Sequence, residues 1–99
     1  MPAVVEVLEP AAAEGLAAAD WYRERSTAAA AAFELAIREG LAEIAENPDA
    51  WPTHVEGTRR FLLRRFPFEI VYILRDSRVL VVAIAHCKRR PAYWRERAG

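Results

Sequence analysis

The stretch from Arg59 to Trp94 constrains the fold more than any other part of this 99-residue chain. Apolar, β-branched and aromatic residues fill three runs within it, namely Arg60–Phe66, Ile70–Leu74 and Val79–Ala85. Only short breaks separate these runs, and this spacing predicts an antiparallel meander of three strands. The last two runs are almost continuously apolar, which is typical of strands covered on both faces.

The first run of the meander alternates in character. Successive side chains of a strand point to opposite faces, so Phe61 and Leu63 share one face while Arg60, Leu62 and Arg64 share the other. The alternation is imperfect, because the apolar Leu62 falls on the face of the two arginines.

A strand and two helices are expected before the meander. The apolar run over Met1–Leu8 predicts the strand, and the alanine-rich segments Ala11–Arg25 and Ala28–Glu46 carry larger apolar residues at helical spacing. Ser26-Thr27 can cap the second helix, and Asn47-Pro48 ends it because a residue before proline disfavours the α conformation. So short a link between two helices predicts an antiparallel hairpin.

Large aromatic residues are expected to fasten these elements to the core. Trp21 and Tyr22 lie near the end of the first helix, where they would pack it on the sheet. Trp51 lies between two prolines in the segment Pro48–Thr58, where it would hold that loop against the core.

The resulting order of elements is β-α-α-β-β-β, followed by a short C-terminal turn or helix over Pro91–Arg97. We predict an α+β fold in which the αα-hairpin packs on one face of a four-stranded, mainly antiparallel sheet. A chain of this length is expected to form a single domain over residues 1–99. Because the hairpin can cover only one face of the sheet, we expect the other face to meet a partner.

The charges are divided between the two halves of the chain. Residues 1–50 contain three basic and ten acidic side chains, a net charge of −7, whereas residues 51–99 contain eleven basic and four acidic ones, a net of +7. The overall charge of zero therefore hides a strong dipole. Such asymmetry points to a polyanionic partner for the basic half, although surface helices rich in glutamate that neutralise the other half would give the same totals.

Cysteine content and hydropathy indicate a cytoplasmic protein. The single cysteine, Cys87, excludes an internal disulfide framework and a cysteine-based zinc cluster. No basic segment followed by an apolar one opens the chain, so we expect no signal peptide. The most apolar run, Val79–Ala85, is too short to span a bilayer, so we expect no membrane partner.

Several motifs resemble those of one toxin superfamily. The predicted hairpin ends at Asn47-Pro48, Arg59-Arg60 precede Phe61-Leu62-Leu63, and Phe66-Pro67-Phe68 lead into the next strand. The last strand runs into a His-x-x-Arg-x-Pro-x-Tyr-Trp tail over residues 86–94. Over nearly its whole length the chain resembles the RelE/ParE superfamily of toxins from bacterial type II toxin–antitoxin systems.

The resemblance implies a cytoplasmic, growth-inhibiting toxin, associated with plasmid stabilisation and held inactive by a cognate antitoxin. We expect the antitoxin to cover the apolar sheet surface and the tryptophans. RelE-like members cut mRNA at the ribosomal A site, whereas ParE-like members use the same fold to poison DNA gyrase. The RelE-like pattern has lysines just before the central strands, where this chain has Arg59 and Arg60, and arginine deprotonates very poorly.

We therefore expect a ParE-like gyrase poison. A RelE-like, ribosome-dependent mRNA endoribonuclease is the alternative, and a non-catalytic partner-binding module is a third possibility. The enzymatic reading requires a general base, a general acid and cations that stabilise the charged phosphorane, all without a metal.

By resemblance to the family nucleases, the candidate catalytic residues are Arg65, His86, Arg90 and Tyr93. His86 can exchange a proton near neutral pH, and Tyr93 could take a proton if neighbouring arginines lowered its pKa. Both residues also have a structural interpretation. A histidine at the end of a strand is often simply hydrogen-bonded, and Tyr93 could pack the C-terminal turn on the sheet.

Clustered cations predict a surface that binds nucleic acid or a partner, since arginine grips phosphate and carboxylate through paired hydrogen bonds. The candidates are Arg59, Arg60, Arg64, Arg65, Lys88, Arg89 and Arg90. The arginines of the first run could instead form a solvated edge that deters strand pairing. The two histidines are far apart and no glycine-rich phosphate loop is present, so we expect no metal and no cofactor.

Overall fold

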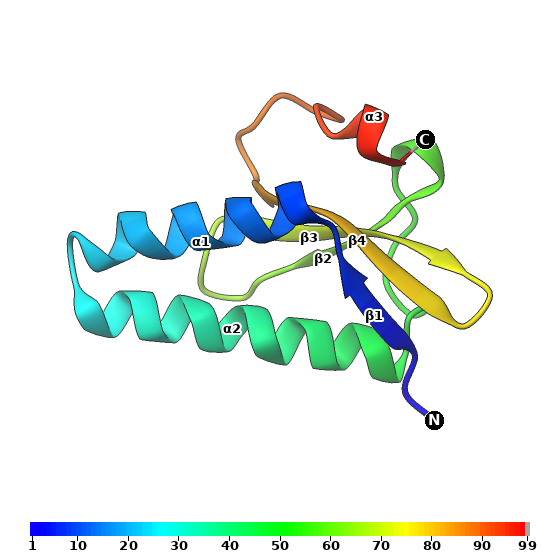
Figure 1. The fold of residues 1–99 in the computed structure, drawn as a ribbon, viewed down its shortest axis with the longest axis horizontal. Helices are drawn as coiled ribbons and strands as arrows, with labels where there is room; N and C mark the ends of the chain where they lie inside the picture. The colour runs from blue at the N-terminus through cyan, green and yellow to red at the C-terminus, as the bar shows by residue number, and fades with distance from the viewer. Residues whose placement is uncertain (99) are drawn as a thin grey trace.

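The computed structural model describes residues 1–98, and its elements follow the predicted order (Figure 1). They are β1 (Val4–Val7), α1 (Glu9–Arg23), α2 (Thr27–Glu46), the 3₁₀ turn η1 (Val55–Gly57), β2 (Arg59–Leu62), β3 (Phe68–Arg75), β4 (Arg78–His86) and α3 (Arg95–Ala98). The predicted α+β class and the β-α-α-β-β-β order are confirmed. No helix within residues 1–98 has the length and apolar character needed to cross a bilayer.

The strands form one four-stranded sheet in the order β1-β4-β3-β2. β1 runs parallel to β4, whereas the β2–β3 and β3–β4 pairs are antiparallel, so the sheet is mainly antiparallel as predicted. Val71 pairs with Ala83 but Tyr72 pairs with Val81, so Val82 is the extra residue of a β-bulge. Val82 and Ala83 consequently both pack on the sheet face away from the hairpin.

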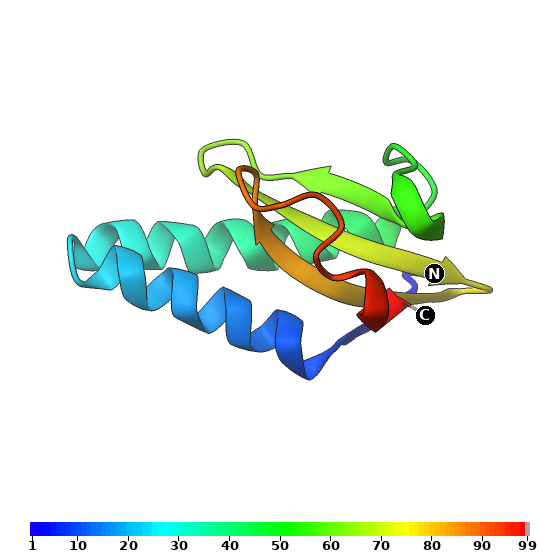
Figure 2. The ribbon, with the colours of Figure 1, turned by 90° about the horizontal axis from the view of Figure 1, so that it is seen from above.

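The helical hairpin is fixed by local signals at its ends. Pro10 lies in the first turn of α1, where its missing N–H costs no hydrogen bond. Ser26 caps α2, because its hydroxyl accepts a hydrogen bond from the Ala29 N–H at 3.1 Å. Gly40 lets α2 lie close to the sheet, since a Cβ there would be only 3.0 Å from the ring of Phe61 and 3.1 Å from Ile70. α1 and α2 thus lie side by side against one face of the sheet (Figures 1 and 2).

The main core fills the space between the hairpin and the sheet. Phe33 and Ile44 from α2 are almost fully buried there, together with Phe61 of β2 and Leu63 just after it, so these two residues share one face as predicted. Tyr22 packs among the aromatic rings, with its centroid 5.2 Å from that of Phe33. The same expectation for its neighbour in α1, Trp21, was wrong, because that side chain is 52% exposed.

The second face of the sheet is covered by the chain's own C-terminal segment. Trp94 is only 3% exposed and packs with Val71, Ile73, Val82 and other residues of β3 and β4. Figure 2 shows α3 on the side of the sheet away from the hairpin. The expectation that a partner covers this face and Trp94 is therefore corrected, because residues far along the sequence fold back over it.

The side chains of Trp51, Tyr72 and Arg59 hold the loop before β2 in place. The ring of Trp51 lies edge-on to Phe61 at a centroid distance of 4.7 Å, as its predicted role in the core requires. The Tyr72 hydroxyl donates to the Pro48 carbonyl at 2.5 Å. Arg59 donates to the carbonyls of Trp51 at 2.7 Å and Asp49 at 3.2 Å. These bonds satisfy loop carbonyls that would otherwise lack partners.

Candidate functional site

Two loops meet at the end of the sheet opposite the β3–β4 turn (Figure 2). One is the segment 63–67 between β2 and β3, and the other is the segment 87–91 after β4. The Cys87 N–H donates to the Pro67 carbonyl at 2.8 Å, which fixes the two loops together. Their exposed cations form a surface that we call the basic end, consisting of Arg64, Arg65, Lys88, Arg89 and Arg90.

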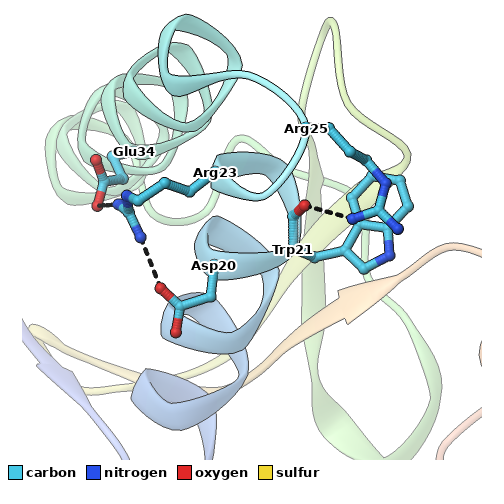
Figure 3. A network of polar contacts seen from close by, with 5 residues as sticks. All are labelled: Asp20, Trp21, Arg23, Arg25 and Glu34. Atoms are coloured by element: carbon cyan, nitrogen blue, oxygen red, sulfur yellow. Dashed lines mark hydrogen bonds and ion pairs between the residues drawn. The ribbon is translucent and has the colours of Figure 1, made fainter.

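The cations of the basic end are available to a partner. Within residues 1–98, no carboxylate lies within ion-pair distance of any of the five. Other arginines are already paired: Arg23, for example, contacts Asp20 at 2.6 Å and Glu34 at 3.0 Å across the two helices (Figure 3). Five exposed like charges at one end of a small protein create a field that attracts anionic groups.

The structure separates two of the predicted binding residues from this group. Arg59 uses its guanidinium on the carbonyls of the preceding loop, as described above. Arg60 lies 3.9 Å from the Glu69 carboxylate and is partly neutralised by it. Arg59 therefore has a structural role, because it holds the preceding loop, and its position in the sequence does not reveal this role.

A pocket of about 390 Å³ lies between α1 and the basic end. Its apolar walls come from Ala17, Ala18, Trp21 and Tyr22 on α1 and from Pro67, Phe68 and Ile84 on the facing strands and loop. Its polar walls are Glu14, His86, Arg89 and Tyr93. Two of the four predicted catalytic residues, His86 and Tyr93, therefore line one concave site, which is the usual geometry of a binding site.

His86 is held by its neighbours in one orientation. Its ring lies 5.1 Å from that of Phe68, centroid to centroid, and its Nδ1 accepts a hydrogen bond from the Lys88 N–H at 3.0 Å. A neutral imidazole that accepts at Nδ1 carries its proton on Nε2. This imidazole therefore keeps one N–H that can donate a hydrogen bond, but its lone pair already accepts one from the Lys88 N–H. The arrangement does not suit a general base.

Tyr93 is bound to a carboxylate that also ties down two other elements. The Tyr93 hydroxyl donates to Oε2 of Glu14, and the Ile84 N–H and Arg97 both donate to Oε1 at 3.0 Å. The Arg89 guanidinium carbon lies 3.9 Å from the centre of the Tyr93 ring. Glu14 thus joins α1, β4 and the C-terminal segment at the pocket wall, and we call this set the Glu14 network.

The Glu14 network makes Tyr93 a poor proton acceptor. Burial, the hydrogen bond to Glu14 and the charge of Glu14 all raise the pKa of Tyr93, and the opposing charges of Arg89 and Arg97 are weaker. Arg89 and Arg97 do lower this pKa, but the net shift is upward because of burial and because a carboxylate not foreseen from sequence contacts the phenol directly. The phenol therefore stays protonated at neutral pH.

All three tyrosines are expected to ionise late. Burial raises the pKa of Tyr22, and it raises the pKa of Tyr72 to about 12. Since an unfolded tyrosine ionises near pH 10, the stability from these raised pKa values is complete below that pH and is lost as pH rises through the folded values. We expect Tyr72 alone to account for a loss on the order of 2 kcal/mol in the free energy of unfolding between about pH 10 and pH 12.

Tyrosinate absorbance and urea unfolding at a series of pH values measure both parts of that prediction. A folded protein in which any of the three tyrosines ionises near pH 10 would contradict it. Tyr72→Phe provides the control, since it removes one phenol with a raised pKa while keeping the ring in the core.

The sequence did not single out two residues of the pocket, Glu14 and Trp21, or Arg97, which contacts Glu14. Glu14 and Arg97 lay within predicted helical or C-terminal segments without an assigned role, and Trp21 was assigned to the core. A carboxylate in the middle of an otherwise alanine-rich helix face is the one signal that pointed to Glu14. Its partners are 70 and 79 positions away, at Ile84 and Tyr93, so local spacing could not identify them.

Comparisons with known proteins agree with the fold and identify the family. A family model described as the ParE toxin of the type II toxin–antitoxin system parDE matches residues 5–91. A solved structure titled "Chromosomal ParDE TA system from P. aeruginosa" is similar, with a TM-score of 0.74 and 21% identity over 85% of this chain and 95% of that chain. A search of curated proteins finds no match. Since the family match extends from β1 through the loop after β4, the chain belongs to the ParE toxin family of type II toxin–antitoxin systems.

Proposed function

We propose that this chain inhibits bacterial growth by poisoning DNA gyrase and that a cognate antitoxin neutralises it in the cytoplasm. In a plasmid-borne system the pair would stabilise the plasmid, because cells that lose the genes would also lose the antitoxin. Membership of the ParE family supports this target class over the ribosome. One geometric observation favours an interface toxin over a nuclease, namely that the Tyr93 phenol and the His86 imidazole are already engaged in hydrogen bonds within the chain.

Metal-free RNA cleavage needs one group that takes a proton from the 2′-hydroxyl and another that protonates the leaving oxygen. Tyr93 donates to Glu14 and has a raised pKa, so it does not serve as the base. His86 uses its Nδ1 lone pair on the Lys88 N–H. The cations of the basic end remain, and exposed cations beside an apolar pocket suit a protein interface as well as they suit phosphate.

The test compares two targets with the same purified protein. Incubated with gyrase, ATP and relaxed plasmid, the protein is expected to block supercoiling and to leave gyrase-dependent DNA breaks. Added to a cell-free translation reaction, it is expected to leave mRNA 5′ ends unchanged. New 5′ ends at A-site codons that appear only with ribosomes would instead establish mRNA cleavage. Inactivity towards both targets would favour the third possibility, a non-catalytic partner-binding module.

A double substitution separates chemistry from interface. In His86→Gln with Tyr93→Phe, both proton-transfer groups are removed while the side-chain sizes are nearly kept. We expect growth inhibition by the free toxin, measured after induction without antitoxin, to change less than about threefold, whereas a nuclease would lose roughly 100-fold or more. Thermal unfolding of the purified variant shows whether the lost Glu14 contact alone has reduced the amount of folded toxin. Loss of toxicity in a folded double variant would contradict the interface mechanism.

A further inference from the structure

We propose that the pocket between α1 and the basic end is where the antitoxin docks an acidic segment that carries a large apolar side chain. This inference rests on the proposed neutralisation by an antitoxin and adds to it a surface and a chemistry. In the bound state the apolar side chain fills the pocket beside Trp21, and carboxylates on either side of it pair with the basic end.

The apolar part of the pocket is incompletely covered by the chain itself. Trp21 is 52% exposed although it stands next to Tyr22, Phe68 and Ile84, which belong to or pack on the main core. A large exposed aromatic beside a concave apolar wall is the kind of feature found at the centre of protein interfaces. The second face of the sheet offers no such site, because Trp94 already covers it.

Trp21 is held in place before any partner arrives. The guanidinium carbon of Arg25 lies 3.6 Å from the centre of the indole, and Arg25 also donates to the Trp21 carbonyl at 2.7 Å (Figure 3). The ring of Tyr22 meets the indole edge-on at 5.1 Å. A side chain that is fixed in the free protein loses little conformational entropy on binding, which favours its use as an anchor.

The charges around the pocket select an anionic partner. Arg89 lines the pocket itself, and the other cations of the basic end stand in the same two loops with no carboxylate partner within residues 1–98. The one carboxylate in the wall, Glu14, does not repel such a partner. Both of its oxygens already accept hydrogen bonds, and Arg97 neutralises it at 3.0 Å.

The combination favours a peptide over a nucleic acid. Phosphates alone would require the cations but leave the apolar pocket beside Trp21 empty. A base could stack on the indole, yet Arg25 already lies over that ring. An acidic segment with one large apolar side chain uses both features together, and its carboxylates speed association by electrostatic attraction.

The experiment titrates purified toxin variants with the purified antitoxin encoded beside this chain and measures the dissociation constant. We expect Trp21→Ala to raise it about 30-fold or more, since it removes the anchor. We expect Arg90→Glu and Arg89→Glu each to raise it about tenfold and to weaken its dependence on salt. The Arg90 side chain makes no ion pair or cation–π contact within residues 1–98, so its variant reports on charge even if Arg89→Glu disturbs Tyr93.

Two matched controls change the same kinds of side chain outside the pocket and the basic end. One removes an apolar side chain, and the other reverses a positive charge. Leu16→Ala deletes an apolar side chain on α1 that is 66% exposed and does not line the pocket. Arg75→Glu reverses a charge at the β3–β4 turn, which lies at the far end of the sheet. Both are expected to bind the antitoxin within about twofold of the unchanged toxin.

Each outcome shows whether the docking site alone is wrong or whether neutralisation by the antitoxin is wrong as well. If the unchanged toxin binds but Trp21→Ala behaves like the controls, the docking site is wrong while neutralisation stands. If only the charge variants bind weakly, the surface is an electrostatic contact without the apolar anchor, and the inference is again overturned. If the unchanged toxin does not bind at all, neutralisation itself fails and the docking site fails with it. Selective loss of binding in Trp21→Ala supports the site even if the toxin proves inactive towards gyrase.

Discussion

Replacing Trp94 by alanine is expected to lower the free energy of unfolding by about 3 to 5 kcal/mol. Trp94 is 3% exposed and fills the apolar surface over Val71, Ile73 and Val82. Its removal takes away the transfer free energy of the indole and leaves a cavity, since the one-turn helix α3 is too short to repack the surface. Such a loss is a large share of the total stability of a small domain, which is about 5 to 15 kcal/mol.

Urea unfolding followed by circular dichroism measures this loss. Trp21→Ala is the matched control, because the same change at a residue that is 52% exposed should cost less than about 1 kcal/mol. Binding of an apolar dye by folded Trp94→Ala would report the uncovered second face of the sheet. Equal losses in the two variants would mean that the C-terminal segment does not seal this face, and the face would again be open to a partner.

The stability that Trp94 provides depends on the C-terminal segment covering the second face of the sheet, which the local sequence pattern did not predict. Two strands that are apolar on both faces correctly predicted two covered faces, and the helical spacing of apolar residues in Ala28–Glu46 correctly placed the hairpin on one of them. The segment after β4 has no apolar periodicity long enough to mark it as a second layer. Its role therefore follows from tertiary packing rather than from local pattern, so a partner was expected where the chain covers itself.

The candidate site was predictable in part for similar reasons. The cations in segments 63–67 and 87–91 are clustered in the sequence, and the two loops must meet because antiparallel strands bring them to one end of the sheet. Phe61 and Leu63 also share one face of the sheet, as predicted, since strand alternation is a local property. The sequence could not reveal that Arg59 binds loop carbonyls or that a helix residue such as Glu14 contacts Tyr93, because both contacts depend on how distant elements pack.

The same packing makes Glu14→Ala the second change with a large expected effect, a loss of about 2 to 4 kcal/mol in the free energy of unfolding. The variant leaves the Ile84 N–H without its acceptor and removes the partner of the Tyr93 hydroxyl and of Arg97. Partly buried donors that lose a charged acceptor are costly because water cannot fully replace it. Glu34→Ala is the control, since that carboxylate makes only an exposed ion pair with Arg23 and should cost less than about 1 kcal/mol.

The Tyr93 pKa supplies a second readout, because Glu14 raises it through a hydrogen bond and a negative charge in addition to the effect of burial. In Glu14→Ala the hydrogen bond and the negative charge that raise this pKa are both absent, while Arg89 and Arg97 still lower it. The pKa of Tyr93 should therefore fall towards its ordinary value, and tyrosinate absorbance of folded Glu14→Ala, with Tyr93→Phe to identify the affected phenol, measures this change. An unchanged Tyr93 titration in a folded variant would mean that burial alone keeps the phenol protonated. Glu14 would then not be the group that prevents Tyr93 from acting as a base, although the phenol itself would still be a poor proton acceptor.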